Sequence, residues 1–394
     1  MTPEKKLALA CVVLSSLPSA ARAVSIVTVS IGNPGNVPAH IGGRDYGGVN
    51  YTDNLSKFEV TAGQYCDFLN AVAGADAYGL YNPSMASTYA EWGCNIQRSG
   101  SAGSYVYNVP SDWADRPVNF VSWGDAARFA NWMHNGQPNG EQTAATTEDG
   151  AYNLNGATSS TALMAVTRSP NATWVIPSDA EWYKAAYHKN DGATGNYFAY
   201  PTASNTAPAN AVIDPDPGNS ANYHITSYSI GGPYYRTVVG EFENSPSPYG
   251  TFDQGGNVDE WTEGVFTTQR ISRGGSFYQN GGLNGGAGGR QTPTNELSTL
   301  GFRLAYLPAI VAADFNCDGH VDLADLEVFQ ACTTGPAIPY DQDNFPPTCS
   351  LQRDSANHIA ADFDADGDVD EADFGVFQRC YSGPTRAPRA DCAN

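Results

Sequence analysis

The last fifth of the chain contains an internal duplication that constrains the shape of two loops. Residues Ala313–Pro336 and Ala361–Pro384 align without gaps at a spacing of 48 residues. Both copies begin with Ala-Asp-Phe, and each has a glycine, Gly319 or Gly367, at the sixth position of an acidic loop. Because glycine adopts backbone angles that other residues avoid, it permits a sharp reversal of the chain at that position. The duplication therefore predicts two loops of the same shape.

Oxygen-bearing side chains occupy loop positions 1, 3, 5, 9 and 12 in both copies. They are Asp314, Asn316, Asp318, Asp322 and Asp325 in the first copy and Asp362, Asp364, Asp366, Asp370 and Asp373 in the second. The residue at position 7, His320 or Asp368, would add its backbone carbonyl. A hard cation such as Ca²⁺ takes about six to eight oxygen ligands, which this spacing supplies. The repeat therefore predicts two calcium sites, and an acidic turn without bound metal is the alternative.

A helix is expected after each loop. Leu326 and Phe329 in the first copy, and Phe374 and Phe377 in the second, follow the spacing of one helix face. The valine at loop position 8 of each copy, Val321 or Val369, is expected to point inward between the paired loops. The repeat thus predicts a small helical module over residues 312–394.

Two departures from ordinary EF-hands point to a more specific resemblance. Position 12 is aspartate rather than glutamate, and no clear helix leads into either loop. Both features resemble dockerin modules, over roughly residues 312–384. The resemblance implies a cohesin-like partner chosen through loop positions 10 and 11, which are Leu323-Ala324 and Glu371-Ala372. Because these pairs differ between the two copies, the module is not expected to dock symmetrically in two orientations. The alternative is a calcium-stabilised module that has no partner.

The segment from residue 24 to residue 308 has a different composition, rich in glycine, asparagine, serine and aromatic residues. Three helices are predicted: one over Thr61–Ala71, one over Ser122–His134 with Ser122 and Asp125 as its cap, and one opened by Ser178. The rest has the pattern of short strands and long loops. This segment is therefore predicted to be an irregular α+β domain.

Several short motifs of this domain occur in an order that identifies a family. They are Phe58–Thr61, Pro117–Trp123, Trp174–Trp182, Gly255–Trp261, Arg273–Phe277 and Leu300–Arg303. Together they resemble the formylglycine-generating enzyme, or sulfatase-modifying factor, family. The resemblance implies a C-type-lectin-like α+β fold with little regular secondary structure over nearly the whole domain.

The same resemblance implies a calcium site next to the Gly255–Trp261 motif. Carried over position by position, its ligands are the side chains of Asp253 and Glu260 and the carbonyls of Gly256 and Val258. Two carboxylates with backbone oxygens suit a hard cation. The alternative is that Glu260 only caps or pairs within a turn.

The residues that would carry the family's reaction are mostly replaced. The family converts a sulfatase cysteine to formylglycine with oxygen, and two of its cysteines bind copper(I) and the substrate thiol. The two cysteine positions fall on Gln279 and Asn284 of this chain. A tryptophan of the family motif is replaced by Asp259. Ser276, in contrast, matches a serine that is used in the family mechanism. Copper(I) is held by soft thiolates, which amides cannot replace, so bound copper is not expected.

Two functions remain open. The first is an exported binding protein whose calcium-stabilised, lectin-like domain recognises a glycan or another exported protein and is tethered by the dockerin-like module. The second is a formylglycine-generating oxidoreductase that matures sulfatases through residues we cannot name. The missing thiolates favour the first function and leave no confident catalytic residue.

The N-terminus predicts export. Lys5-Lys6, an apolar stretch over Leu7–Leu17 and the small-x-small site Ala21-Arg22-Ala23 form a signal peptide over residues 1–23. No later segment approaches the roughly 20 apolar residues of a membrane span. A secreted, cell-surface or periplasmic location is expected.

Charge and cysteine content add two constraints. The formal net charge is −21, and residues 312–394 contain 16 Asp and Glu against 4 Arg and Lys. This acidity excludes a general nucleic-acid binder, which needs a basic surface. In an oxidising compartment, Cys66 and Cys94 are expected to pair, and the five cysteines of the tail are expected to form one or two bridges.

Overall fold

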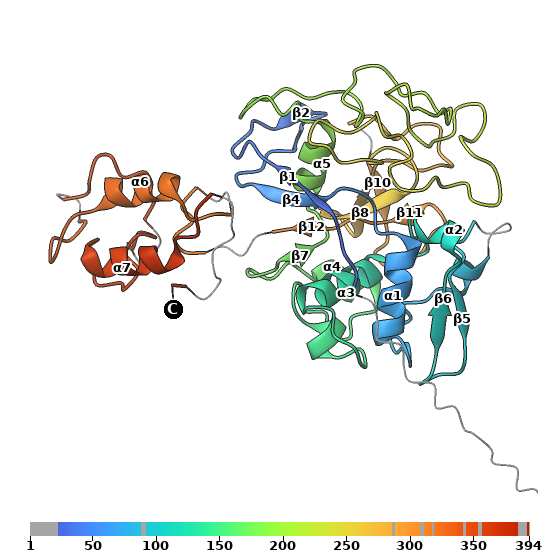
Figure 1. Ribbon diagram of the computed structural model, residues 1–394, viewed down its shortest axis with the longest axis horizontal. Helices are drawn as coiled ribbons and strands as arrows, with labels where there is room; N and C mark the ends of the chain where they lie inside the picture. Colours follow the sequence, from blue (N-terminus) through green and yellow to red (C-terminus); the bar gives the residue numbers. More distant parts are fainter. Residues whose placement is uncertain are drawn as a thin grey trace, which may run out of the picture.

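The computed structural model describes residues 23–87, 92–285, 288–307, 311–316, 319–341, 344–353, 357–384 and 392–393. Of the signal peptide predicted for residues 1–23, only Ala23 lies within these ranges. Cys317, Asp318 and Pro308, the predicted end of the large domain, also lie outside them. Figure 1 shows a large body formed by the first three quarters of the chain and a small helical module formed by the rest.

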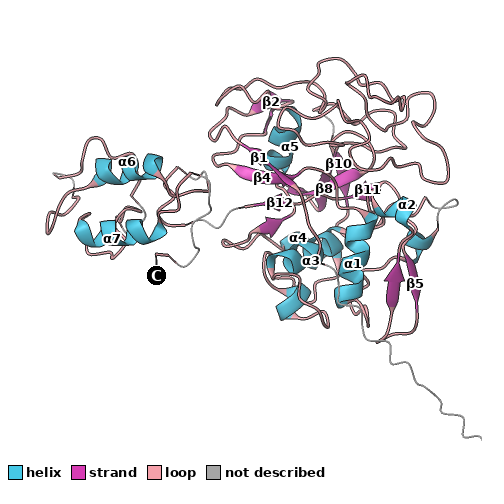
Figure 2. Ribbon diagram, viewed as in Figure 1, coloured by secondary structure: helices cyan, strands magenta, loops and turns pink. Residues whose placement is uncertain are grey.

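The large body is a mixed α/β fold with few helices, and Figure 2 shows that loops form much of it. Its strands are β1 Thr28–Ile31, β2 Ala39–Ile41, β3 Arg44–Tyr46, β4 Asp53–Ser56, β5 Gln97–Ser99, β6 Val106–Asn108, β7 Trp174–Val175, β8 Asp259–Phe266, β9 Gln269–Arg273, β10 Gly289–Gln291, β11 Leu300–Gly301 and β12 Ala305–Tyr306. Its helices are α1 Ala62–Val72, α2 Ser111–Ala114, α3 Trp123–His134, α4 Ser160–Ala165 and α5 Asp179–Tyr187, with single turns of 3₁₀-helix at Pro83–Ala86 and π-helix at Ala144–Glu148.

Two four-stranded sheets organise this body. One has the order β1-β4-β12-β7, and the other has the order β10-β9-β8-β11. In the second sheet β8 pairs antiparallel with β9 and parallel with β11, with Leu300 opposite Asp259 and Gly301 opposite Glu260. The second sheet therefore brings the three motifs near the end of the domain to one place.

The three helices expected from sequence are confirmed. Capping boxes start α1 at Thr61, α3 at Ser122 and α5 at Ser178. In each box the cap side chain and the residue three positions later satisfy backbone N–H groups that the first helical turn leaves unpaired. The short helices α2 and α4 were not predicted.

Aromatic side chains fill the core where α1 meets α3. Phe68 of α1 lies edge-on to Phe129 of α3, with ring centroids 5.2 Å apart, and contacts Trp132 at the same distance. Phe302 joins the cluster between β11 and β12, at 5.4 Å from Phe129. The motif Leu300–Arg303 is thus anchored in the core of the body. None of the helices in the described ranges is long and apolar enough to cross a membrane.

The C-terminal module has its own apolar core, built around α6 Leu323–Cys332 and α7 Glu371–Cys380. Both helices follow the loops as predicted, and Phe329 and Phe377 are buried. The duplication produces a reciprocal arrangement. The backbone N–H of Ser382, after α7, donates to the carbonyl of Val321 in the first loop, and the backbone N–H of Thr334, after α6, donates to the carbonyl of Val369 in the second loop. Both valines are fully buried, as expected.

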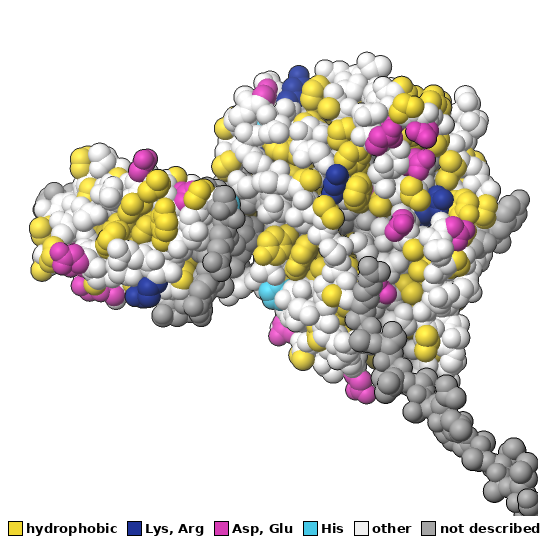
Figure 3. Space-filling model, in the orientation of Figure 1, with side chains coloured by type: hydrophobic (Ala, Val, Ile, Leu, Met, Phe, Trp, Pro, Cys, Tyr) yellow, Lys and Arg dark blue, Asp and Glu magenta, His cyan; other side chains and the backbone are white. Residues whose placement is uncertain are grey.

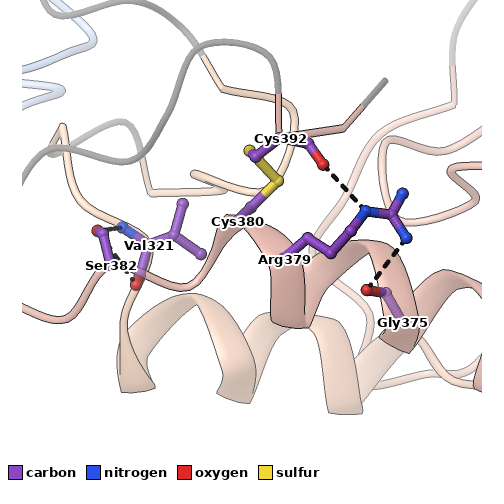
Figure 4. The surroundings of a disulfide bond; sticks show 6 residues. All are labelled: Val321, Gly375, Arg379, Cys380, Ser382 and Cys392. Atoms are coloured by element: carbon purple, nitrogen blue, oxygen red, sulfur yellow. Dashed lines mark hydrogen bonds between the residues drawn. A yellow bond between two sulfur atoms is a disulfide. The ribbon is translucent and has the colours of Figure 1, made fainter.

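Two disulfides close this module. One joins Cys332 to Cys349, and the other, shown in Figure 4, joins Cys380 to Cys392. The expectation of one or two bridges in the tail is confirmed. The expected pairing of Cys66 with Cys94 is wrong, because both are free thiols in the core of the large body.

Candidate functional site

A small polar pocket lies between β8, the turn after β9 and β10. Its volume is about 230 Å³. Its lining residues are Asp259, Gly274, Gly275, Gln279, Gly282, Gly288, Gly289 and Gln291. Because five of the eight are glycines, the hydrogen-bonding side chains of Asp259, Gln279 and Gln291 determine the chemistry of the pocket.

The turn after β9 holds the carboxylate in place. Gly274 and Gly275 have φ angles of 98° and 69°, which disfavour any other residue. A Cβ on Gly275 would also lie 2.9 Å from the carbonyl of Gly281. This close approach lets the N–H of Gly275 donate to Oδ1 of Asp259 at 3.1 Å. The Arg273–Phe277 motif is therefore needed for the backbone shape of the site.

Asp259 is buried and chemically perturbed. Burial, reinforced by the negative charge of Glu260, raises its pKa to about 7 despite hydrogen bonds from Gly275 and the side chain of Gln279. A carboxyl that titrates near neutral pH in a pocket is a common feature of functional sites. Asp259 thus changes from a neutral hydrogen-bonding acid to a charged acceptor near physiological pH.

The structure separates the two positions where the resemblance places cysteines. Gln279 lines the pocket together with Asp259, whereas Asn284 does not line it, although both residues are exposed. Ser276 is fully buried, and its hydroxyl has no hydrogen-bond partner among the described residues. The pocket therefore offers carboxylate and carboxamide groups and no thiol.

An aromatic cluster around Trp92, which sequence reasoning did not single out, includes the residue that precedes Gln279 in the chain. Tyr278, next to Gln279, is 51% exposed, and its ring lies 5.2 Å from that of Trp92. Trp92 also contacts Phe277 and Tyr235. The only sequence signal for this cluster was the general abundance of aromatic residues.

A second group of charged residues is centred on Glu260 of β8. Glu260 is fully buried, and its carboxylate accepts two hydrogen bonds from Arg303, at 2.5 and 2.7 Å, and one from the indole of Trp182 at 2.7 Å. Glu260 is therefore paired, but with residues distant in the chain rather than within a turn as the alternative above supposed. Arg303, from the Leu300–Arg303 motif, was not identified as its partner from sequence.

The other members of the implied calcium set are close by. Asp253 accepts a hydrogen bond from the N–H of Gly240 at 2.6 Å, and burial raises its pKa to about 6. Gly256 and Val258 lie in the buried segment between Asp253 and β8. Glu59, which sequence reasoning missed, completes the group, because the charges of Asp253 and Glu260 both act on its carboxyl.

In the second C-terminal loop, the structure brings together most of the predicted ligands. Carboxylate oxygens of Asp362, Asp364 and Asp373 lie within 4.8 Å of one another, as do those of Asp368, Asp370 and Asp373. Asp366 lies in the same turn, where its side chain accepts the N–H of Asp368. This loop has the oxygen-rich geometry that a hard cation requires.

The first loop repeats part of this geometry. Asp325 accepts the N–H groups of Phe315, Asn316 and Asp322, as Asp373 does from Phe363, Asp364 and Asp370. Asp314 accepts the N–H of Gly319, and Asp322 caps α6. His320 follows Gly319 at the turn, and Asp318 lies outside the described residues.

The comparison with known families identifies the large body. The profile of the sulfatase-modifying factor enzyme 1-like domain (FGE-sulfatase) matches residues 53–307. The chain therefore belongs to this family, as its motifs predicted. No curated protein sequence matches the chain.

Several solved structures are similar over most of this chain, and three of them are described below. CarF is 22% identical, with 73% of this chain and 99% of CarF covered and a TM-score of 0.43. Variable protein 1 of Treponema denticola is 18% identical, with 73% of this chain and 97% of that protein covered and a TM-score of 0.41. PvdO from Pseudomonas aeruginosa is 17% identical, with 72% of this chain and 91% of PvdO covered and a TM-score of 0.39.

Proposed function

We propose that the protein is an exported binding protein of the sulfatase-modifying factor family that recognises the hydroxyl groups of a glycan in the Asp259 pocket. The observation that carries this proposal is the pocket lining, in which Asp259 lies with Gln279, at a family cysteine position, and with Gln291. A carboxylate and two carboxamides offer both donors and acceptors to neighbouring hydroxyls. The exposed ring of Tyr278 provides an apolar face beside them.

The absence of thiolates argues against the family's copper chemistry at this site. Copper(I) prefers thiolate ligands, and an amide supplies none. The two cysteines in the described part of the large body are buried elsewhere, and burial raises the pKa of Cys66 to about 12 and raises that of Cys94. Both groups therefore remain protonated thiols at neutral pH.

The binding proposal is tested by probing the purified protein on a glycan array at pH 8 and measuring each retained glycan by calorimetry. Gln279→Ala should weaken binding at least tenfold, because it removes a hydrogen-bonding side chain from the pocket. Asn284→Ala is the matched control, since Asn284 is exposed and outside the lining. Retention of no glycan, or equal binding by both variants, would overturn the proposal.

The alternative, a formylglycine-generating oxidoreductase, has a direct test. The protein is incubated with copper(I), oxygen and a peptide that carries the sulfatase cysteine motif, and the peptide is analysed by mass spectrometry. We expect the cysteine to remain unchanged. Formation of the aldehyde would establish the oxidase and refute a function restricted to binding.

We also propose that Ca²⁺ occupies both C-terminal loops and one site in the large body near Asp253. The clustered carboxylates of the second loop support the first part. Calorimetry should show that Asp318→Ala together with Asp366→Ala removes two calcium ions per chain. Unchanged stoichiometry would refute the assignment of the loops.

The C-terminal module is proposed to dock onto a cohesin-like domain. In support, a hollow of about 340 Å³ is lined by Leu326, Phe374, Phe377, Gln378 and Tyr381. Figure 3 shows hydrophobic side chains gathered on this module. Surface plasmon resonance over immobilised cohesin domains should show binding with Ca²⁺ that is lost with a chelator. No binding under either condition would leave a calcium-stabilised module without this partner.

A further inference from the structure

We infer that the cation site of the large body is built on Glu59 and Asp253, and that Glu260 is not one of its ligands. The inference rests on the proposed calcium site near Asp253 and changes its ligand set. It assigns a metal-binding role to Glu59, which no motif in the sequence indicates.

Glu260 is already neutralised. Arg303 approaches its carboxylate with two N–H groups, and Trp182 donates a third hydrogen bond. The side chains of Glu260 and Arg303 are both completely buried. A bidentate arginine of this kind satisfies the charge and most of the lone pairs of a carboxylate, so a metal ion at Glu260 would have to displace a buried guanidinium.

Glu59 is in the opposite situation. Its residue is 2% exposed, and neither carboxylate oxygen has a hydrogen-bond partner among the described residues. Protonation alone would leave an O–H donor without an acceptor at this position, whereas a bound cation would satisfy both oxygens at once. Buried carboxylates without partners are rare because the loss of hydration is not compensated.

Asp253 lies on the same side of the cluster. The N–H of Phe252 donates to the carbonyl of Lys57 at 2.8 Å, which places the two segments that carry Asp253 and Glu59 next to each other. Arg303 also donates to the carbonyls of Ser56 and Phe252 between them. Three carboxylates therefore surround one guanidinium, and two negative charges remain for a divalent cation.

The site lies beside a groove. Glu59 borders a hollow of about 630 Å³, together with residues 23–27 and α1, and its carboxylate oxygens are buried next to it. Asp67 and Asp115 line the same groove, and its described lining contains no lysine or arginine. The acidic lining favours cations in the groove next to Glu59. Carboxylate oxygens are the ligands that Ca²⁺ prefers.

The test uses the full-length protein carrying Asp318→Ala and Asp366→Ala, in which the C-terminal loops no longer compete for calcium. Calorimetry of this parent with CaCl₂ should show one remaining site, and Glu59→Gln should weaken that site at least tenfold. Asp115→Asn is the matched control, because it removes an exposed carboxylate from the same groove. It should bind calcium as the parent does.

Thermal unfolding guards against a misfolded variant. Without calcium, Glu59→Gln should unfold at about the same temperature as the parent, because glutamine has nearly the size and shape of the glutamic acid that it replaces. Added calcium should raise the unfolding temperature of the parent and leave that of Glu59→Gln unchanged. A variant that failed to fold would instead be less stable under both conditions.

The outcomes separate the inference from the proposals on which it rests. If calcium binds, is lost in Asp253→Asn and is unaffected by Glu59→Gln, the calcium site survives and the role of Glu59 is refuted. If the parent binds no calcium, both statements fail. Glycan binding at Asp259 is tested on its own and is independent of either result.

Discussion

Asp259 lies where the family resemblance places a tryptophan, and this exchange puts a carboxyl group into a buried pocket. The Gly275 N–H and the Gln279 side chain partly compensate for the lost hydration of Asp259, yet burial still raises its pKa to about 7. The neighbouring Glu260 avoids this penalty, because Arg303 neutralises it. Two adjacent acids on β8 therefore differ: Asp259 lines a pocket, and Glu260 pairs with Arg303 in the core.

The pKa of Asp259 leads to a prediction about pH. In the unfolded chain this carboxyl releases its proton near pH 4, whereas the folded protein retains it up to about pH 7. The folded state binds more protons between these values, so the contribution of Asp259 to stability falls as pH rises from about 4 to about 7. Asp259→Asn, which stays neutral, should match the wild type in unfolding temperature at pH 5 and exceed it at pH 8. An equal difference at both pH values would contradict the shift.

Arg303 supports a second prediction at the same scale. Arg303→Met should destabilise the large body by about 3–5 kcal/mol, because it leaves Glu260 as an unpaired buried charge. Urea titration followed by tryptophan fluorescence measures the loss. Arg44→Met is the control, since Arg44 is exposed. A loss below about 1 kcal/mol would mean that Glu260 finds another partner or takes up a proton.

Residue identities could be carried over from the family motifs, but their partners could not. Gln279 and Asn284 looked equivalent in the sequence, and only the fold shows that the first lines the pocket and the second does not. Glu59 lies in the Phe58–Thr61 motif, but the sequence did not show that its carboxylate would be buried without hydrogen-bond partners. Its lack of partners depends on Asp253 and Arg303, which are distant in the chain.

At the scale of elements, local chemistry was sufficient for the helices and insufficient for the strands. The capping residues of α1, α3 and α5 lie within one turn of the helices they start, so sequence alone located them. Strand β12, in contrast, is two residues long and pairs with β4 and β7 from distant parts of the chain. Such pairings depend on the whole fold, and no periodic pattern in a two-residue strand could predict them.

The disulfides of the C-terminal module make a prediction for its helices. The bond from Cys332, at the end of α6, to Cys349 closes a loop with a sequence separation of 17 residues. Replacing both cysteines with alanine should destabilise the module by about 2–4 kcal/mol, chiefly by freeing the unfolded chain. Loss of far-UV circular dichroism on heating measures the effect. Cys66→Ala, in the large body, should leave this transition unchanged, and a shift caused by Cys66→Ala instead would contradict the assignment.

For the whole molecule, the two regions have separate apolar cores and different sources of stability. One core gathers the aromatic residues of α1, α3 and the sheets, and the other gathers the residues around α6 and α7. The large body needs no disulfide among its described residues, whereas the C-terminal module has two. The module also contains 16 acidic against 4 basic residues, so its metal-free form is under strong charge repulsion.

These differences predict two independent unfolding transitions. All seven tryptophans lie between Trp92 and Trp261, so tryptophan fluorescence reports on the large body alone. A reductant combined with a calcium chelator should lower the unfolding temperature of the C-terminal module, which fluorescence does not detect. The unfolding temperature of the large body should not change, because its free thiols form no disulfide that could be reduced. Added salt should partly restore the transition of the C-terminal module in the chelated protein by screening the repulsion among the aspartates. Calorimetry and fluorescence on the same sample provide the measurement. A single transition seen by both methods, and shifted equally by the reductant and chelator, would show that the two cores unfold as one unit.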